Sequence, residues 1–240
     1  MLNGGDHRFR DTIASALGWW ADAGVDAPIA EMPRDWLTPP AKPAPAAASF
    51  ATTSPVASLP DDLAAFHALL AEGAYVPGAG LPRLRVAPSG DPASGLMIVV
   101  DMPDGDDVRG GPLFSGTTAR LFDAILAAMG RTRDTIYCAP LSPVRLHGGR
   151  IDAPEPLAAL MRRHIALVRP RAVMLFGDET CRALLGMERG QARGGLRSLN
   201  HDGGTVPAIA IVHPRHMLKH PVCKAEAWAD MRLLIGEFAS

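Results

Sequence analysis

Four short, mostly apolar segments constrain the fold of this chain more than any other feature. Segments of this length and composition are typical of strands buried on both faces of a parallel sheet. They lie at residues 95–100, 134–141, 171–177 and 206–212, and segments with helical spacing lie at 117–130, 155–170, 178–186 and 224–238. Because strand and helix alternate, we predict an α/β fold with three layers, α/β/α, around a four-stranded, mainly parallel sheet.

The chain before the first apolar run differs in composition from the rest. Residues 1–37 contain a segment of helical spacing and predict a helical arm, whereas the Pro- and Ala-rich residues 38–60 are typical of a linker. Asp61 is suited to cap a helix at the start of the remaining segment. We therefore expect a single α/β domain over residues 61–240, preceded by an arm and a linker.

Tryptophans and cysteines bear on partners and location. The arm carries Trp19, Trp20 and Trp36, which we expect to dock it on the domain or on a partner protein. The cysteines are odd in number and widely spaced, which favours free thiols in a reducing compartment; they are Cys138, Cys181 and Cys223. No apolar run reaches the roughly 18 residues of a membrane span, and the polar N-terminus lacks a signal-peptide core. We expect a cytoplasmic monomer without a membrane partner.

Polar loops follow three of the predicted strands, where parallel α/β sheets bind ligands. The first loop, residues 101–116, contains four aspartates: Asp101, Asp104, Asp106 and Asp107. They could bind Mg²⁺ for phosphoryl transfer, supply a carboxylate that activates water, or simply form turns. Phe114 lies between small residues of this loop and could be either a core residue or a platform on which a base stacks.

The third loop, "HPRHMLKHP" at residues 213–221, is dense in basic and titratable groups. His213 comes directly after an apolar run, so its ring should lie at the mouth of the sheet, where it could hydrogen-bond a developing anion. The basic residues after it could hold a backbone phosphate. A capped turn leading into the last helix is the alternative, but so many basic groups in nine residues favour a functional loop.

Taken together, these motifs resemble the uracil-DNA glycosylase superfamily, most nearly its family 4. Residues 100–104 correspond to that family's "GEAPG" motif, residues 110–116 to its "GxPFVG" motif and residues 213–221 to its "HPSYLLRNP" motif. The stretch 154–186 is similar to its "QIxLIxPKVIVxLGxxAxxxLLG", and the resemblance covers about residues 95–236. It implies a parallel sheet between helices, and hydrolysis of the N-glycosidic bond of uracil in DNA after the base has been flipped out of the stack.

The resemblance also implies roles by position. Asp101 would orient water or stabilise the cationic sugar, and His213 would hydrogen-bond the leaving base as negative charge builds on it. Phe114 would stack on the flipped base. Further contacts to the base are implied for Met102, Pro103 and Pro140, and contacts to DNA for Ser115, Pro214, Arg215, His216 and Lys219.

Two departures from the family pattern shape the cofactor and substrate predictions. Family 4 holds a [4Fe–4S] cluster through four cysteines, but this chain has none before Cys138, and Val144 and Leu157 fall near the third and fourth ligand positions. A cluster needs thiolates or close substitutes, so we predict no cluster, no other cofactor and no metal site. Pro140 replaces the asparagine that reads the base edge, and since proline has no side-chain donor the preferred base stays open.

Three functions remain open from the sequence. The first is a DNA glycosylase of base excision repair that acts on uracil or another damaged base. The second is an inactive relative that binds DNA or a repair partner. The third is a Mg²⁺-dependent phosphoryl-transfer enzyme, which the lack of a Gly-Lys-Ser/Thr phosphate loop disfavours.

Overall fold

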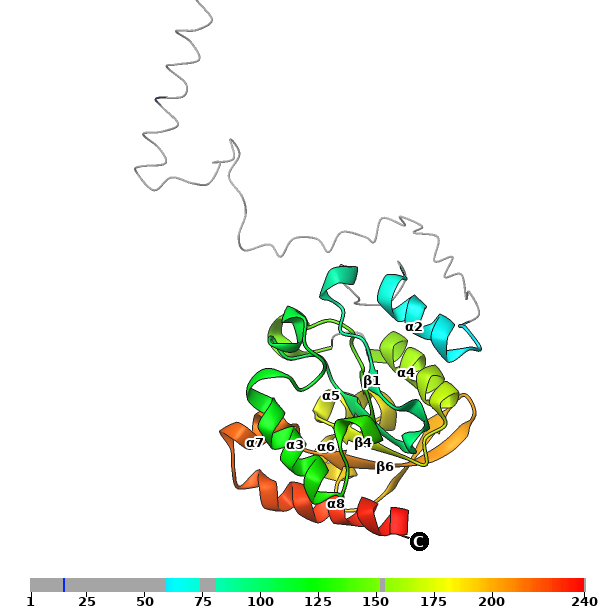
Figure 1. Cartoon of the computed structure of the whole chain (residues 1–240). Coiled ribbons are helices and arrows are strands. Elements are labelled where there is room, and N and C mark those ends of the chain that lie inside the picture. Colours follow the sequence, from blue (N-terminus) through cyan, green and yellow to red (C-terminus); the bar gives the residue numbers. More distant parts are fainter. Residues whose placement is uncertain (1–14, 16–58, 74–80, 152–153, 240) are drawn as a thin grey trace, which may run out of the picture. The chain divides into compact units, whose positions relative to one another are not determined.

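The computed structural model describes residues 15, 59–73, 81–151 and 154–239 (Figure 1). The chain divides into two units, Met1–Pro55 and Val56–Ser240, and the fold below is that of the second. The predicted arm, apart from Ser15, and the predicted linker, apart from its last two residues, lie outside the described residues.

A six-stranded sheet forms the centre of the second unit, in the order β1-β3-β2-β4-β6-β5. The strands are β1 (Ser89–Gly90), β2 (Leu96–Val100), β3 (Tyr137–Pro140), β4 (Ala172–Phe176), β5 (Arg197–His201) and β6 (Gly204–Ile211). The four inner strands run parallel to one another, while β1 and β5 pair antiparallel at the two edges. The predicted parallel core is therefore confirmed, but the predicted total of four strands is wrong.

The two edge strands escaped the sequence analysis for physical reasons. β1 has only two residues, too few to form a pattern. β5 has the sequence Arg-Ser-Leu-Asn-His, and Leu199 is its one buried residue, so no apolar run marks it. Edge strands are commonly short and polar, because a long apolar edge would invite pairing with another chain.

The helices follow the predicted order. They are α2 (Leu63–Glu72), α3 (Ala119–Ala128), α4 (Pro154–Val168), α5 (Asp178–Leu185), α6 (Arg189–Ala192), α7 (Pro214–Lys219) and α8 (Cys223–Ala239). The short helices α6 and α7 were not predicted. The cap of α2 is Asp62 rather than the predicted Asp61: the Asp62 carboxylate accepts the Ala65 amide at 2.9 Å, whereas Asp61 pairs with Arg163.

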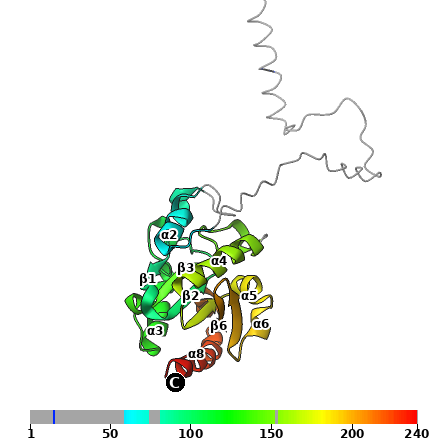
Figure 2. The same cartoon turned by 90° about the vertical axis from the view of Figure 1, so that its right-hand side faces the viewer.

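Helices cover both faces of the sheet, which confirms the three predicted layers. In β2, Ile98 and Val100 pack with residues of α3 and α8, whereas Met97 and Val99 pack with residues of α4 and α5. Figure 2 shows α3 on one side of the sheet and α5 with α6 on the other. Each such side chain contributes about 1.5–3 kcal/mol by burial, so this alternation fixes the register of β2. None of the helices described is long and apolar enough to cross a membrane.

Candidate active site

The ends of β2 and β6 bring two distant residues together. Asp101 directly follows β2, His213 follows β6 by two positions, and both strands flank β4 in parallel. The Nε2 atom of His213 lies 3.7 Å from Oδ1 of Asp101, and the two residues are only 4% and 6% exposed. The structure therefore places both predicted catalytic residues in one buried site at the carboxyl edge of the sheet.

The hydrogen bonds of His213 indicate which of its ring nitrogens carries the proton. His213 caps α7, and its Nδ1 accepts the backbone N–H of Arg215 at 3.1 Å. Burial lowers the pKa of His213 well below its usual value, and the nearby Arg215 and His216 lower it further. A neutral ring whose Nδ1 accepts must carry its proton on Nε2. That Nε2 is buried and has no hydrogen-bond partner among the described residues, so it is a free donor beside Asp101.

Asp101 has two partners that favour its ionised form. Its Oδ1 accepts the Met102 amide at 2.8 Å, and the Arg215 guanidinium contacts both carboxylate oxygens at 2.6 and 2.5 Å. Burial raises the pKa of Asp101, while Arg215 and the Met102 amide act in the opposite direction. Because the guanidinium contacts both oxygens, we assign Asp101 as a carboxylate at neutral pH.

Two arginines from other segments of the chain, Arg215 and Arg145, lie against the first loop. Arg215 also donates to Oδ1 of Asp104 at 2.8 Å, so it bridges two aspartates. Arg145 lies beside the same carboxylate at 3.4 Å and donates to the Pro103 carbonyl at 3.3 Å. In this structure Arg215, a predicted DNA contact, faces inward and pairs with both aspartates.

Phe114 lies in the hydrophobic layer against α3. It is 1% exposed, it stacks on Phe122 with ring centroids 4.1 Å apart, and its centroid is 5.5 Å from the His213 ring. Its backbone has a φ of +57°, which is uncommon for a non-glycine residue. The Arg133 guanidinium donates to the carbonyls of Leu113 and Phe114 at 2.9 and 2.8 Å and holds this turn. The sequence analysis missed Arg133, because it lies outside every motif.

The other aspartates of the loop shape it. Asp107 is buried and accepts the Asp104 amide at 2.9 Å and the amide and hydroxyl of Ser115 at 2.8 and 2.7 Å. Asp106 pairs with Arg109. In the part of the chain that the structure describes, no group of three or more His, Cys, Asp or Glu side chains could hold a metal ion. The geometry therefore favours the turn-forming interpretation over the magnesium site.

A cavity of about 270 Å³ opens beside Asp101 and His213. Gly177, directly after β4, forms part of its wall with a φ of +105°, and a Cβ there would come within 3.1 Å of Asp101 Oδ2. Other charged residues in its lining are Asp178, Glu179, Arg182 and Arg189. The sequence analysis missed this wall, although a glycine at the end of the strand between two functional strands could have indicated it.

The remaining predicted residues fall into three groups. Met102, Pro103 and Pro214 are buried, Ser115 is half-buried and engaged by Asp107, and His216 and Lys219 are exposed on α7. His216 also lines the cavity beside His213. Pro140 instead lines a separate cavity between α2 and α4, so the structure does not bring it to the His213 cavity.

The residues present do not fit a [4Fe–4S] cluster. The chain has three cysteines, and Cys138 and Cys181 pack on opposite faces of the sheet. Burial raises the pKa of both thiols, that of Cys181 to about 12, so they stay protonated and are poor ligands. Val144 and Leu157, which stand near the other ligand positions, are buried apolar residues.

Comparison with known proteins agrees with this fold. A family model described as the uracil DNA glycosylase superfamily matches residues 87–232, a segment that holds all six strands as well as Asp101 and His213. The type-4 uracil-DNA glycosylase of Archaeoglobus fulgidus is similar, with 23% identity over 172 residues that cover 68% of this chain and 81% of that protein. The resemblance seen in the motifs is thereby confirmed, and the chain belongs to the uracil-DNA glycosylase superfamily.

Proposed function

We propose that this protein hydrolyses the N-glycosidic bond that joins uracil or another damaged base to deoxyribose in DNA. Membership of the superfamily supports the reaction class. The observation that carries the proposal is the free, buried Nε2–H of a neutral His213 at 3.7 Å from Asp101. A hydrogen-bond donor and a carboxylate side by side match the two opposite charges that develop when this bond breaks.

Each of the two residues can stabilise one of the charges that develop as the bond breaks. When the bond from C1′ to the base nitrogen breaks, its electron pair leaves with the base, and C1′ becomes cationic. The His213 Nε2–H would donate to the base as negative charge grows on it, and the Asp101 carboxylate would stabilise the cationic sugar or orient the attacking water. Water then adds hydroxide to C1′ and its proton ends on the departing base. Both groups act most strongly in the transition state, which is what accelerates a reaction.

A second candidate function rests on the contact between Arg215 and Asp101. The Arg215 guanidinium occupies both oxygens of the Asp101 carboxylate. A protein that keeps this pair closed on DNA would bind without cutting, as an inactive relative that recognises DNA or a repair partner.

Base release from oligonucleotides separates the two functions. Single- and double-stranded substrates carrying uracil or hypoxanthine are incubated with the full chain, and abasic sites are revealed by alkaline cleavage. We expect release that falls at least about 100-fold in Asp101→Asn and in His213→Ala. His201→Ala and Asp202→Asn, at the opposite end of the sheet, are matched controls that should retain the rate.

Each other outcome has a defined meaning. Salt-dependent DNA binding without release from any substrate would favour the inactive relative. Release that survives both Asp101→Asn and His213→Ala would refute the assigned roles. Absence of DNA binding would contradict both candidate functions.

A further inference from the structure

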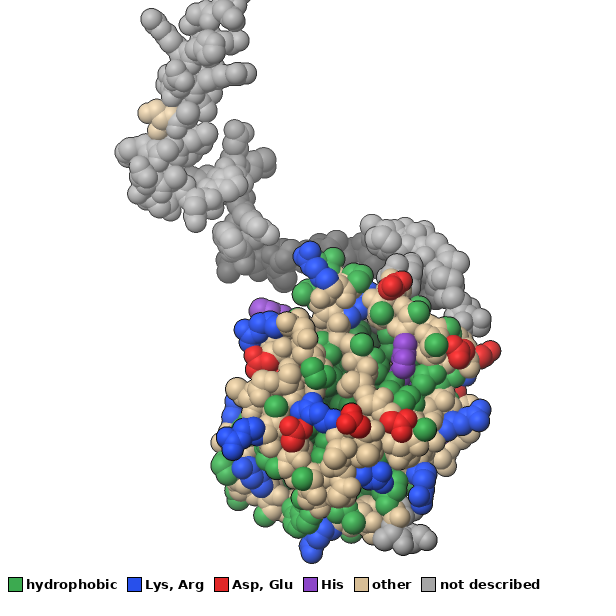
Figure 3. All heavy atoms as spheres, viewed as in Figure 1, with side chains coloured by type: hydrophobic (Ala, Val, Ile, Leu, Met, Phe, Trp, Pro, Cys, Tyr) green, Lys and Arg blue, Asp and Glu red, His purple; other side chains and the backbone are tan. Residues whose placement is uncertain are grey.

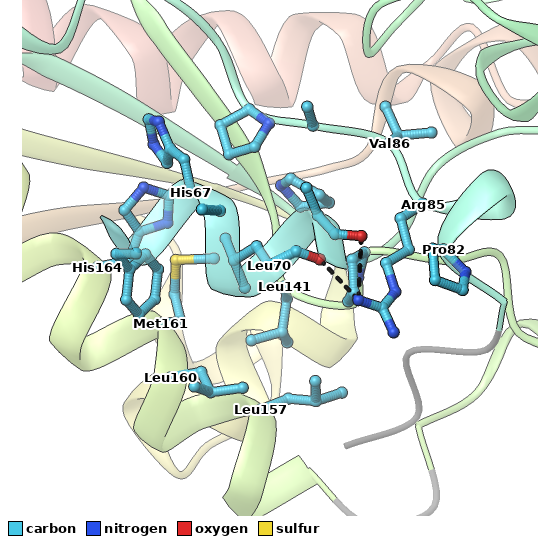
Figure 4. Close-up of a pocket in the computed structure, with 17 residues that line it drawn as sticks. His67, Leu70, Pro82, Arg85, Val86, Leu141, Leu157, Leu160, Met161 and His164 are labelled. Atoms are coloured by element: carbon cyan, nitrogen blue, oxygen red, sulfur yellow. Dashed lines mark hydrogen bonds between the residues drawn. The ribbon is translucent and has the colours of Figure 1, made fainter. Parts of the chain in front are cut away.

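A second cavity, of about 350 Å³, lies between α2 and α4 and shares no lining residue with the cavity at His213. Hydrophobic side chains gather around a hollow with a histidine on the face shown in Figure 3. Figure 4 shows Leu157, Leu160 and Met161 of α4 on one side of this cavity and Leu70 of α2 close by. The cavity is open to the surface, since Ala68 and Ala71 in its lining are exposed.

Two histidines in the wall of this cavity are joined by the hydroxyl of a tyrosine behind them. The Tyr137 hydroxyl lies 2.6 Å from Nε2 of His67 and 2.8 Å from Nε2 of His164, so it joins the two imidazoles. Phe66 packs against the His164 ring at a centroid distance of 4.9 Å. The two histidines line the cavity from α2 and α4, and Tyr137 fixes their rings from β3.

The cavity wall is almost free of formal charge. Burial lowers the pKa of His164 to about 3 and also lowers that of His67, so both rings are neutral at pH 7. Arg85 is the one charged residue among the described residues of the lining. Its guanidinium donates to the carbonyls of Leu70 and Ala71 at 3.1 and 3.2 Å, at the end of α2, as the dashed lines in Figure 4 show.

We propose that the cavity between α2 and α4 binds a neutral, mostly apolar molecule that contains either one ring or two fused rings. A single hydrogen-bonding group of this molecule would be directed at His67. The volume lies at the lower end of the range for small-molecule pockets, which limits the ligand to a small one. Apolar walls with a few placed polar groups are the usual composition of such pockets. A cationic ligand would lose its hydration and find no negative charge to replace it, because Arg85 is the one charged residue among the described residues of the lining.

The binding site adjoins the strand end that supports the candidate active site. Leu141, in the cavity wall, donates its amide to the Val100 carbonyl at 2.7 Å, and the Ser142 amide donates to the Asp101 carbonyl at 3.0 Å. Amide signals of Leu141 and Ser142 are therefore reporters of occupancy that do not depend on any catalytic activity.

Titration with indole tests the proposal. Indole is a neutral two-ring compound with one N–H donor, and its binding to the full, ¹⁵N-labelled chain is followed through amide shifts. We expect saturable shifts at Leu70, Leu141 and Ser142 but not in α8. Ala71→Trp and Ala68→Trp, at exposed positions that line the cavity, should weaken binding at least about tenfold. Ala65→Trp is the matched control, because Ala65 is exposed on the same helix and is not in the lining.

Two further probes test the chemical class. Benzothiophene has the shape of indole without its N–H, and it should bind more weakly than indole to the native protein. In His67→Phe, which keeps a ring, the preference for indole should disappear. Benzylammonium should bind at least about tenfold more weakly than indole because of its positive charge. The proposal is overturned if indole shows no saturable shifts, if both Ala71→Trp and Ala68→Trp bind it as the native chain does, or if benzylammonium binds equally well.

Discussion

Mild acid should destabilise this domain through its buried imidazoles, among which His164 is 1% exposed. The His164 ring accepts or donates a single hydrogen bond with the Tyr137 hydroxyl at 2.8 Å. Burial lowers its pKa to about 3, and the neighbouring His67 contributes to the lowering. The fold therefore holds His164 neutral over a pH range in which the same histidine, in the unfolded chain, becomes charged.

The size of the effect follows from proton linkage. A group whose pKa is lowered on folding because its charged form is buried, as for this histidine, contributes a penalty that is absent above its unfolded pKa and grows as the pH falls toward its folded pKa. For His164 the loss of stability begins near the ordinary histidine pKa of 6.5 and continues toward 3. At 1.36 kcal/mol per pH unit, His164 alone should remove about 2 kcal/mol from the free energy of unfolding when the pH is lowered from 7 to 5.

Urea unfolding at pH 7 and pH 5, followed by circular dichroism, measures this effect when the native chain is compared with His164→Gln. Glutamine can still hydrogen-bond Tyr137 but does not titrate, so the loss between the two pH values should be smaller by about 2 kcal/mol. His201→Gln, at a half-exposed position, should lose as much stability as the native chain. An equal loss in the native chain and in His164→Gln would refute the linkage.

Three further predictions concern the aspartate loop. Asp107→Ala removes three partly buried hydrogen bonds and should lower the free energy of unfolding by about 2–4 kcal/mol in a urea titration. Gly116→Ala should cost about 1–2 kcal/mol more than Gly130→Ala, because both positions have positive φ but only at Gly116 would a Cβ overlap the side chain of Asp106. Asp104→Asn removes a negative charge at the mouth of the site and should tighten DNA binding about threefold at low salt, as measured by fluorescence anisotropy, with no gain at high salt.

The central fold could be predicted from the sequence because burial on both faces leaves a pattern in one dimension. The runs that became β2, β3, β4 and β6 are apolar at nearly every position, and the helices between them carry their own spacing. The antiparallel edge strand β5 could not be predicted in this way. Its pairing depends on β6 beside it rather than on its own residues, of which only Leu199 is buried.

The candidate site, too, could be predicted only in part from the sequence. Asp101 and His213 could be selected because each follows an apolar strand, and parallel strands bring their carboxyl ends together. The inward direction of Arg215 and the stacking of Phe114 on Phe122 depend on side-chain packing across elements, which spacing does not encode. Arg133 acts through backbone carbonyls of another segment, and no residue pattern marks such a contact.

The contact between Arg215 and Asp101 also bears on the order of events under the proposed function. A buried carboxylate without a partner is costly, so Asp101 needs the guanidinium when DNA is absent. A DNA phosphate can take over Arg215, and the cationic sugar then replaces Arg215 as the partner of Asp101 in the transition state.

Asp101 and Arg215 would act as a unit, and the effects of substituting them should not add. The test applies when Arg215→Gln alone lowers base release at least about tenfold. We then expect the double variant Asp101→Asn, Arg215→Gln to release bases at a rate within about threefold of that of Asp101→Asn alone. Losses that multiply would show that Arg215 contacts DNA independently of Asp101.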